Sequence, residues 1–178
     1  DEAINYFKKV IKLNPNNIKA RKNLNDISSI AVPGWHLSMM NDTSRNNAYY
    51  DAIKLAVEDG MFVLDIGTGS GLLSMMAANS GAGKVITCEV NKTIAEVAKE
   101  VINSNRLANK ISVINKKSTD LIVGKDLPQK ADLIISEVLS SEFVGEGVRK
   151  TAFDANKRLL KTGAKIIPQS GKIRISLV

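Results

Sequence analysis

The stretch from residue 63 to residue 71, VLDIGTGSG, constrains the fold more than any other part of this sequence. Residues 61–66 are a short, mostly apolar run, which predicts a buried parallel strand that ends at a glycine-rich turn. Residues 72–78 are small and apolar at helical spacing. Strand, turn and helix in this order form the first unit of a doubly wound sheet, in which ligands bind beyond the carboxyl ends of the strands. We therefore predict an α/β fold with a ligand site at this turn.

The spacing of the glycines indicates which ligand the turn binds. Gly67, Gly69 and Gly71 stand in a G-x-G-x-G pattern, whereas the dinucleotide fingerprint is G-x-G-x-x-G. Asp65 precedes the glycines by two residues, and Glu89 ends the next apolar run. A carboxylate at the tip of the second strand is placed to accept hydrogen bonds from a ribose diol. This combination resembles the cofactor site of class I S-adenosylmethionine-dependent methyltransferases. The alternative is a turn that only joins strand and helix.

The composition excludes several classes of protein. The chain has 178 residues and a formal net charge of +7, but its basic residues are not interleaved with aromatic residues, which make up 4% of the sequence. We therefore expect no nucleic-acid partner. Cys88 is the single cysteine, which rules out a disulfide within the chain and predicts a reducing location, cytoplasmic or nuclear. No apolar run approaches the roughly 20 residues of a membrane span, so we expect no membrane association, and we predict no metal site.

Residues 1–31 predict two helices that precede the α/β part. Apolar residues within 1–13 recur on one helical face, and Pro15 follows the end of that helix. Ala3, Phe7 and Pro15 stand where a tetratricopeptide repeat has its characteristic residues, so this segment resembles one partial repeat. A single partial repeat cannot bury its own apolar face, and two linker helices are the alternative interpretation.

A Val-Pro-Gly-Trp break at residues 32–35 marks a domain boundary, after which we predict one helix over 36–60. Asp42 and Arg45 lie three residues apart on that helix, so they either pair with each other or converge on a ligand. Residues 61–168 then alternate between apolar strands and helices, as is typical of a doubly wound sheet. The predicted strands are 61–66, 84–88, 111–114, 131–136 and 165–168, and the predicted helices are 72–78, 91–107 and 148–160. Asn91 is the predicted N-cap of the helix over 91–107.

The loop after the fourth predicted strand, residues 136–147, carries an acidic cluster. It contains Glu137, Glu142 and Glu146 and has no basic residue before Arg149, in a chain whose net charge is +7. The loop follows the carboxyl end of a strand and lies beside the glycine turn. We therefore predict that it receives a cationic group of a substrate.

The acidic loop also carries a resemblance to a known family. Ser136, Glu137 and Glu146 fit the S-E-(x)8-E frame of the protein arginine methyltransferases, and the chain resembles that family. Residues 118–120, residues 124–128 and the Gly-Glu-Gly ending of the loop resemble the branch numbered seven and nine in animals. The ninth member carries tetratricopeptide repeats before its catalytic part, which the predicted N-terminal helices resemble.

The resemblance implies a Rossmann-like domain over residues 61–168 with S-adenosylmethionine as its cofactor. Residues 32–60 are similar to the family's N-terminal helices, which close over the cofactor. The implied cofactor contacts are Asp65, Gly67, Gly69 and Gly71 along the methionine portion, Arg45 on its carboxylate, Glu89 on the ribose, Ser118 and Thr119 at the adenine, and His36 and Met39 as a cover.

The resemblance further implies that Glu137 and Glu146 are catalytic. They clamp the guanidinium group of an arginine, which stays cationic because its pKa exceeds about 12. Charge-assisted hydrogen bonds draw positive charge toward the clamped nitrogens, and the remaining terminal nitrogen is freer to attack the sulfonium methyl group. We therefore expect methylation of arginine in a protein or peptide substrate.

The chain also departs from the family pattern. Family members continue into a β-barrel with a Thr-His-Trp loop and a dimerisation arm. Residues 169–178 resemble only the first strand of that barrel, and His36 and Trp35, the single histidine and tryptophan, lie far upstream. We expect dimerisation only where the barrel is present. Two alternatives stay open, namely a class I methyltransferase that acts on another substrate and a non-catalytic, repeat-containing binding fragment.

Overall fold

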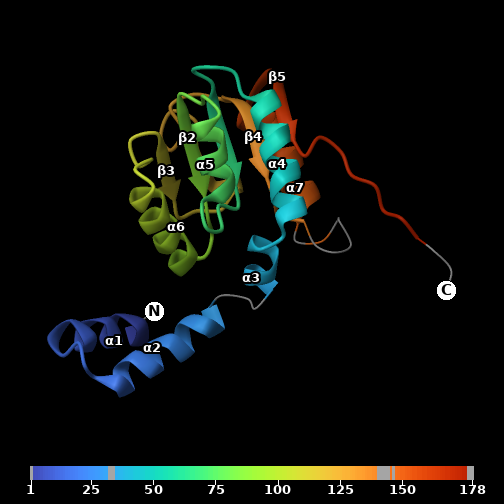
Figure 1. Cartoon of the computed structure of the whole chain (residues 1–178). Coiled ribbons are helices and arrows are strands. Elements are labelled where there is room, and N and C mark those ends of the chain that lie inside the picture. The colour runs from blue at the N-terminus through green and yellow to red at the C-terminus, as the bar shows by residue number, and fades with distance from the viewer. Residues whose placement is uncertain (1, 32–34, 140–144, 146, 176–178) are drawn as a thin grey trace. The chain divides into compact units, whose positions relative to one another are not determined.

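The computed structural model describes residues 2–31, 35–139, 145 and 147–175. The chain divides into two compact units, Asp1–Asn46 and Asn47–Val178. The second of these units contains the whole β-sheet (Figure 1). No helix within the described ranges is long and apolar enough to cross a lipid bilayer.

The first unit contains a helical hairpin. α1 (Glu2–Leu13) and α2 (Ile18–Ala31) pack against each other. The second helix has a side-chain cap, because Asn17 Oδ1 accepts a hydrogen bond from the Ala20 backbone N–H at 2.9 Å. The two predicted N-terminal helices are confirmed, and their identity as a tetratricopeptide repeat stays a prediction.

Residues 36–56 contain two helices separated by a break, and residues 57–60 are not helical, so the prediction of a single helix over 36–60 is wrong. α3 (Trp35–Met40) ends before Asp42, and α4 (Thr43–Ala56) begins directly after it. The break arises because Asp42 is the N-cap of α4, with its Oδ1 accepting a hydrogen bond from the Arg45 backbone N–H at 2.9 Å. Asp42 therefore contacts the backbone of Arg45 to cap a helix.

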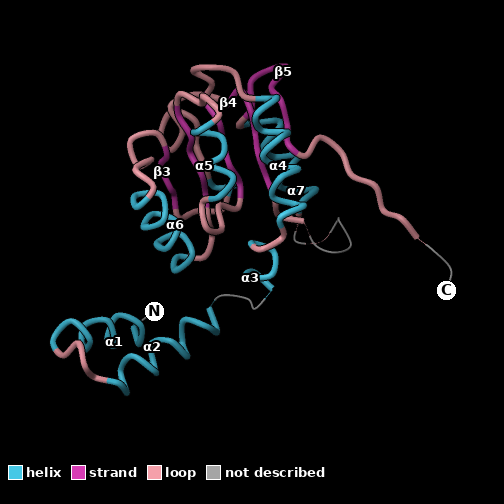
Figure 2. Tube along the Cα trace, in the orientation of Figure 1, coloured by secondary structure: helices cyan, strands magenta, loops and turns pink. Residues whose placement is uncertain are grey.

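The second unit is built on five parallel strands in the spatial order β3-β2-β1-β4-β5. Figure 2 draws the strands in magenta. The central strand β1 precedes the glycine turn, and the order along the chain reverses on its two sides, as in a doubly wound sheet. The predicted α/β fold class is thereby confirmed. The strands are β1 (Phe62–Ile66), β2 (Lys84–Cys88), β3 (Ile111–Ile114), β4 (Ala131–Ser136) and β5 (Leu160–Ile167).

An apolar cluster covers each face of the sheet, and alternate residues of β1 supply the two clusters. Val63 belongs to the cluster shared with α4, α5 (Leu72–Asn79) and α6 (Lys92–Ser104). Leu64 belongs to the cluster shared with α7 (Val148–Arg158) and with the segment after β3. Both side chains are fully buried, which explains why the central strands are apolar at consecutive positions.

The second unit begins within α4. Ile53 of α4 is fully buried in the sheet's core, so this unit begins inside that helix, at Asn47. The predicted boundaries after residues 31 and 60 stay predictions. Residues 169–175 have no regular secondary structure, and residues 176–178 lie outside the described part of the chain. The predicted barrel strand at residues 169–178 therefore stays a prediction.

Candidate active site

The glycine turn after β1 is hydrogen-bonded to the end of β2. The Gly67 and Thr68 N–H groups both donate to the Cys88 carbonyl oxygen, at 3.0 and 3.1 Å. Gly67 has a φ of +85° and Gly71 a φ of +87°, in the left-handed region that glycine adopts at little cost. Burial raises the pKa of the Cys88 thiol to about 12, so this thiol is not a nucleophile at neutral pH. Cys88 therefore contributes to the site through its backbone carbonyl oxygen, which holds the glycine turn.

The glycine turn also lies against the chain that leaves β4. A Cβ atom placed on Gly67 would lie 2.7 Å from Cγ1 of Val138 and 3.9 Å from the carbonyl oxygen of Glu137. A real Cβ does not approach another carbon that closely, so a side chain at this position would require Val138 to shift, in addition to the strain of the positive φ. The predicted cofactor turn and the predicted catalytic residue Glu137 are thus neighbours at one edge of the sheet.

Asp65 is a fully buried carboxylate beneath the turn. Its Oδ2 accepts hydrogen bonds from Ser74 Oγ at 2.6 Å and from Thr87 Oγ1 at 3.1 Å. Burial raises the pKa of Asp65 to about 6, partly offset by these hydrogen bonds, and the charge of nearby Glu89 raises it further. Oδ1 has no hydrogen-bond partner among the described residues. The site therefore contains one buried acceptor that an approaching donor would satisfy.

Asp65 makes the stability of the fold pH-dependent. Because its pKa rises from 3.8 to about 6 on folding, the folded protein binds this proton more tightly than the unfolded chain does. The stabilisation is fully present below about pH 4 and is lost as the pH rises through about 6. Relative to Asp65→Asn, the wild-type protein should lose about 2 kcal/mol of unfolding free energy between about pH 4 and pH 7, measured by urea denaturation. A difference that stays constant over this range would contradict the burial argument.

Glu89 connects the glycine turn to the start of α6. Its Oε2 accepts a hydrogen bond from the Gly69 N–H at 3.3 Å, and its Oε1 accepts one from the Asn91 N–H at 2.9 Å. Asn91 Oδ1 in turn caps α6 by accepting from the Thr93 N–H at 3.0 Å, as its position in the sequence predicts. Each carboxylate oxygen has a second lone pair available for a ligand hydroxyl. The ribose role of Glu89 fits this geometry and stays a prediction.

Ser118 and Thr119 lie in η1 (Ser118–Asp120), a single 3-10 turn that follows β3. Ser118 is buried, and Thr119 Oγ1 lies 3.4 Å from Asp120 Oδ1. Because β3, β2 and β1 are neighbours in that order, this turn, Glu89 and the glycine turn follow the carboxyl ends of three adjacent strands. The structure thus brings together the predicted cofactor residues Asp65, Gly67, Gly69, Gly71, Glu89, Ser118 and Thr119.

Glu137 directly follows β4 and is partly buried. The Tyr49 hydroxyl of α4 donates to the Ser136 carbonyl oxygen at 3.2 Å, which fastens the end of the strand one residue before Glu137. Glu146 lies outside the described residues, as do residues 140–144. The predicted pairing of the two carboxylates therefore stays a prediction.

The other three predicted cofactor residues belong to the first compact unit. Met39 lies in α3, and Arg45 lies in α4, where its Nη1 donates to Asn46 Oδ1 at 2.7 Å. His36 is in α3, with its side chain outside the described part of the structure. Their predicted contacts with the cofactor stay predictions.

Four residues that build this site were not predicted from the sequence, namely Thr87, Ser74, Tyr49 and Val138. Thr87 pairs with Asp65 in the register of β2 and β1, which the alignment of the two apolar runs would have indicated. The contacts of Ser74, Tyr49 and Val138 depend on how α5, α4 and the loop after β4 pack, and no sequence pattern indicates them. Within the described ranges, no group of three or more His, Cys, Asp or Glu side chains could hold a metal ion.

Comparison with known proteins gives consistent results for this part of the chain. Residues 48–173 match the sequence profile of the family described as ribosomal protein L11 methyltransferase (PrmA). Protein arginine N-methyltransferase 9 of Xenopus laevis is 38% identical over 97% of this chain and 22% of its own length. The arginine N(omega)-methyltransferase of Streptomyces achromogenes is 42% identical over 83% of this chain and 41% of its own length. The chain thus spans less than half of these curated relatives.

Solved structures show the same relationship. The Trypanosoma brucei PRMT1 enzyme–prozyme heterotetrameric complex with AdoHcy contains a chain that is 31% identical, with a TM-score of 0.70, over 78% of this chain and 43% of that chain. Protein arginine methyltransferase 10 of Arabidopsis thaliana is 32% identical, with a TM-score of 0.65, over 74% of this chain and 37% of that chain. The chain belongs to the methyltransferase family that the PrmA profile describes, and these relatives are arginine methyltransferases.

Proposed function

We propose that this protein transfers a methyl group from S-adenosylmethionine to a guanidinium nitrogen of arginine in protein substrates. The observation that carries the proposal is the contact between the glycine turn and the loop after β4. A Cβ at position 67 would lie 2.7 Å from Cγ1 of Val138, the residue that follows Glu137. A methyl donor on the glycine turn and a cation on Glu137 would therefore be neighbours, which is the arrangement that methyl transfer requires.

The residues at this edge fit S-adenosylmethionine. The unpartnered Asp65 Oδ1 is a buried acceptor suited to the ammonium group of the methionine portion. Glu89 is fixed at the end of β2, where a ribose diol would meet it, and Gly67, Gly69 and Gly71 have no side chain that would obstruct a ligand. When bound, the cofactor supplies an electrophilic methyl group on a positively charged sulfur.

The protein's part in the reaction is to hold and polarise the acceptor. Glu137, with Glu146 as its partner in the proposal, would bind the guanidinium through charge-assisted hydrogen bonds. The two carboxylates would concentrate positive charge on the bound nitrogens. The lone pair on the free terminal nitrogen then becomes more available for in-line attack, and holding the reactants in contact supplies a large part of the rate.

A second candidate substrate is free arginine. The 42% identical relative from Streptomyces is named arginine N(omega)-methyltransferase, without reference to a protein substrate. Both candidates present the same guanidinium group to the same carboxylates, so they differ only in what surrounds it.

The proposal is tested with radiolabelled S-adenosylmethionine and the full-length protein, supplied in parallel with a glycine-arginine-rich peptide, its lysine-substituted counterpart and free arginine. We expect label on the arginine peptide and none on the lysine peptide. Label on free arginine alone would favour the second candidate. Cofactor binding without transfer to either form of arginine would reject the guanidinium as the acceptor.

Glu89→Ala should weaken binding of S-adenosylmethionine about ten- to a hundredfold, measured by titration calorimetry. A hydrogen bond to a charged acceptor is worth roughly 1.5–3 kcal/mol, which corresponds to that range. Glu100→Ala removes an exposed glutamate of α6 on the same unit and should leave the affinity unchanged. Equal affinities of the wild-type and Glu89→Ala proteins would reject the ribose role.

A further inference from the structure

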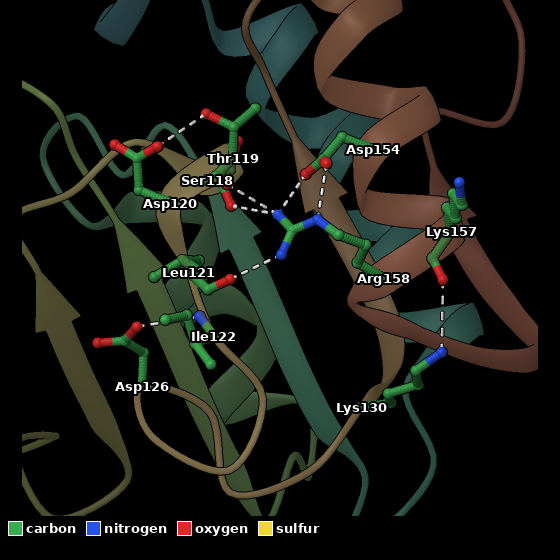
Figure 3. Close-up of polar contacts among 10 residues, drawn as sticks. All are labelled: Ser118, Thr119, Asp120, Leu121, Ile122, Asp126, Lys130, Asp154, Lys157 and Arg158. Atoms are coloured by element: carbon green, nitrogen blue, oxygen red, sulfur yellow. Dashed lines mark hydrogen bonds and ion pairs between the residues drawn. The ribbon is translucent and has the colours of Figure 1, made fainter.

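A single guanidinium group of α7 holds the turn after β3. Arg158 Nη1 donates to the Leu121 carbonyl oxygen at 2.9 Å, and its Nη2 donates to the Thr119 carbonyl oxygen at 3.0 Å (Figure 3). The Ser118 carbonyl oxygen lies 3.5 Å from the same Nη2. One side chain therefore contacts three carbonyl oxygens of η1 and its C-cap, from a helix about forty residues further along the chain.

Asp154 fixes the orientation of this guanidinium. Arg158 Nε donates to Asp154 Oδ1 at 2.7 Å, and Nη2 donates to Asp154 Oδ2 at 2.6 Å (Figure 3). This is the planar two-point pairing that arginine makes and lysine cannot. The hydrogen bonds from Arg158 lower the pKa of Asp154, and the pKa of Arg158 is raised in return, so the pair is ionised at neutral pH.

The turn is also held by the burial of Ser118 and Leu121 and by two backbone hydrogen bonds of its own. Within it, the Asp120 N–H donates to the Lys117 carbonyl oxygen at 3.0 Å and the Leu121 N–H donates to the Ser118 carbonyl oxygen at 3.2 Å. A 3-10 turn of three residues leaves its remaining carbonyl oxygens without internal partners. The Arg158 donors occupy the Thr119 and Leu121 carbonyl oxygens and thereby help to set where the backbone of η1 and the partly exposed Thr119 side chain lie.

The place of the turn suggests which part of a ligand it meets. The glycine turn, Glu89 and η1 follow the carboxyl ends of β1, β2 and β3, which are adjacent strands. If the methionine portion of the cofactor lies at the glycine turn and the ribose at Glu89, the base lies at η1. We propose that Arg158, oriented by Asp154, is a positioning residue that holds η1 in the conformation that discriminates the edge of the cofactor's base. This inference rests on the proposed cofactor.

The test compares two ligands that differ only at that edge of the base. S-adenosylhomocysteine carries an amino group on the purine, and S-inosylhomocysteine carries an oxygen at the same position. The wild-type full-length protein should prefer the first by about tenfold in Kd, as one hydrogen bond allows. Arg158→Met should bind S-adenosylhomocysteine about tenfold more weakly and lose most of the preference. Because a ratio of two Kd values does not depend on the fraction of folded protein, partial unfolding of the variant does not obscure the result.

A second measurement needs no ligand. In hydrogen exchange, the Asp120 and Leu121 amides should exchange faster in Arg158→Met than in the wild type, while the β4 amides keep their protection. Asp154→Asn leaves Arg158 in place but weakens the two-point pairing, so both effects should be intermediate. Lys161→Met is the matched control, because it breaks another 2.6 Å ion pair, with Asp132, and should alter neither the preference nor exchange in η1.

Two results would overturn the inference, namely an Arg158→Met protein that keeps the wild-type preference and a wild-type protein that has none. Neither ligand donates a methyl group, so the outcome does not depend on the methyl acceptor. A normal ligand preference without methylation of arginine would count against the proposed function and leave the role of Arg158 supported.

Discussion

Glu137→Gln and Glu146→Gln are each expected to lower methyl transfer to arginine at least about a hundredfold. Each change keeps the size of the side chain and removes its charge. Leaving one partner of a desolvated ion pair without its counter-charge costs on the order of 3–5 kcal/mol. Glu137 follows β4 directly, and the hydrogen bond from Tyr49 to Ser136 fixes the end of that strand, so a structural change elsewhere is not expected. Methyl transfer should be measured at saturating cofactor.

Two controls separate loss of the clamp from other effects. Glu142→Gln makes the same chemical change in the same loop and should keep nearly normal transfer. The affinity for S-adenosylmethionine should be nearly unchanged in all three variants, because neither clamp residue contacts the cofactor in the proposal. Nearly normal arginine methylation by Glu137→Gln or Glu146→Gln would reject the clamp and favour a methyltransferase with another substrate.

Gly67→Ala should damage both stability and cofactor binding. Its φ of +85° disfavours any residue with a Cβ, and that Cβ would lie 2.7 Å from Val138 Cγ1. The strained backbone costs about 1–2 kcal/mol and the forced displacement of Val138 adds about 1–3 kcal/mol. We expect a loss of about 2–5 kcal/mol in unfolding free energy by urea denaturation. Cofactor affinity should fall at least about tenfold, because the turn and the residue after Glu137 move together.

Gly124→Ala is the matched control for this substitution. Gly124 has a φ of +90°, but a Cβ placed there would have no atom within 4 Å. It therefore imposes the same backbone strain without the steric contact, and we expect a loss of only about 1–2 kcal/mol with unchanged cofactor affinity. If both substitutions destabilise the protein equally and leave the cofactor affinity unchanged, the contact between the glycine turn and the loop after β4 contributes neither to stability nor to cofactor binding.

Local patterns in the sequence were sufficient for most of the sheet and for the start of α6. The predicted strands 84–88, 111–114 and 131–136 coincide with β2, β3 and β4, because strands buried on both faces are continuous apolar runs. Asn91 caps α6 as predicted, because an N-cap depends only on residues two or three positions away. The glycine spacing and the position of Glu89 after a predicted strand likewise indicated one ligand site, and in the structure the Gly69 N–H donates to Glu89.

Two predicted elements differ most from the structure. In one, a helix cap competed with a helical pattern, and in the other, pairing with a neighbouring strand decided where the strand begins. The predicted helix over 36–60 is interrupted because Asp42 prefers to cap α4. β5 begins at Leu160, five residues before the predicted strand, although residues 161–163 have the composition of a turn. Pairing with β4 carries the strand through Gly163, at φ +78°, with an irregular register between Ala131 and Leu133.

The sequence by itself determined the doubly wound fold, the glycine turn and the acidic residues that end β2 and β4, because each depends on neighbours in the chain. Tertiary structure alone decided the order β3-β2-β1-β4-β5 and the contact of Gly67 with Val138. It also decided the hydrogen bonds from Arg158 to carbonyl oxygens of η1 and its C-cap, which lie 37 to 40 residues before Arg158 in the chain. A backbone carbonyl is present at every residue, so no pattern of side chains shows which carbonyls a distant arginine will reach.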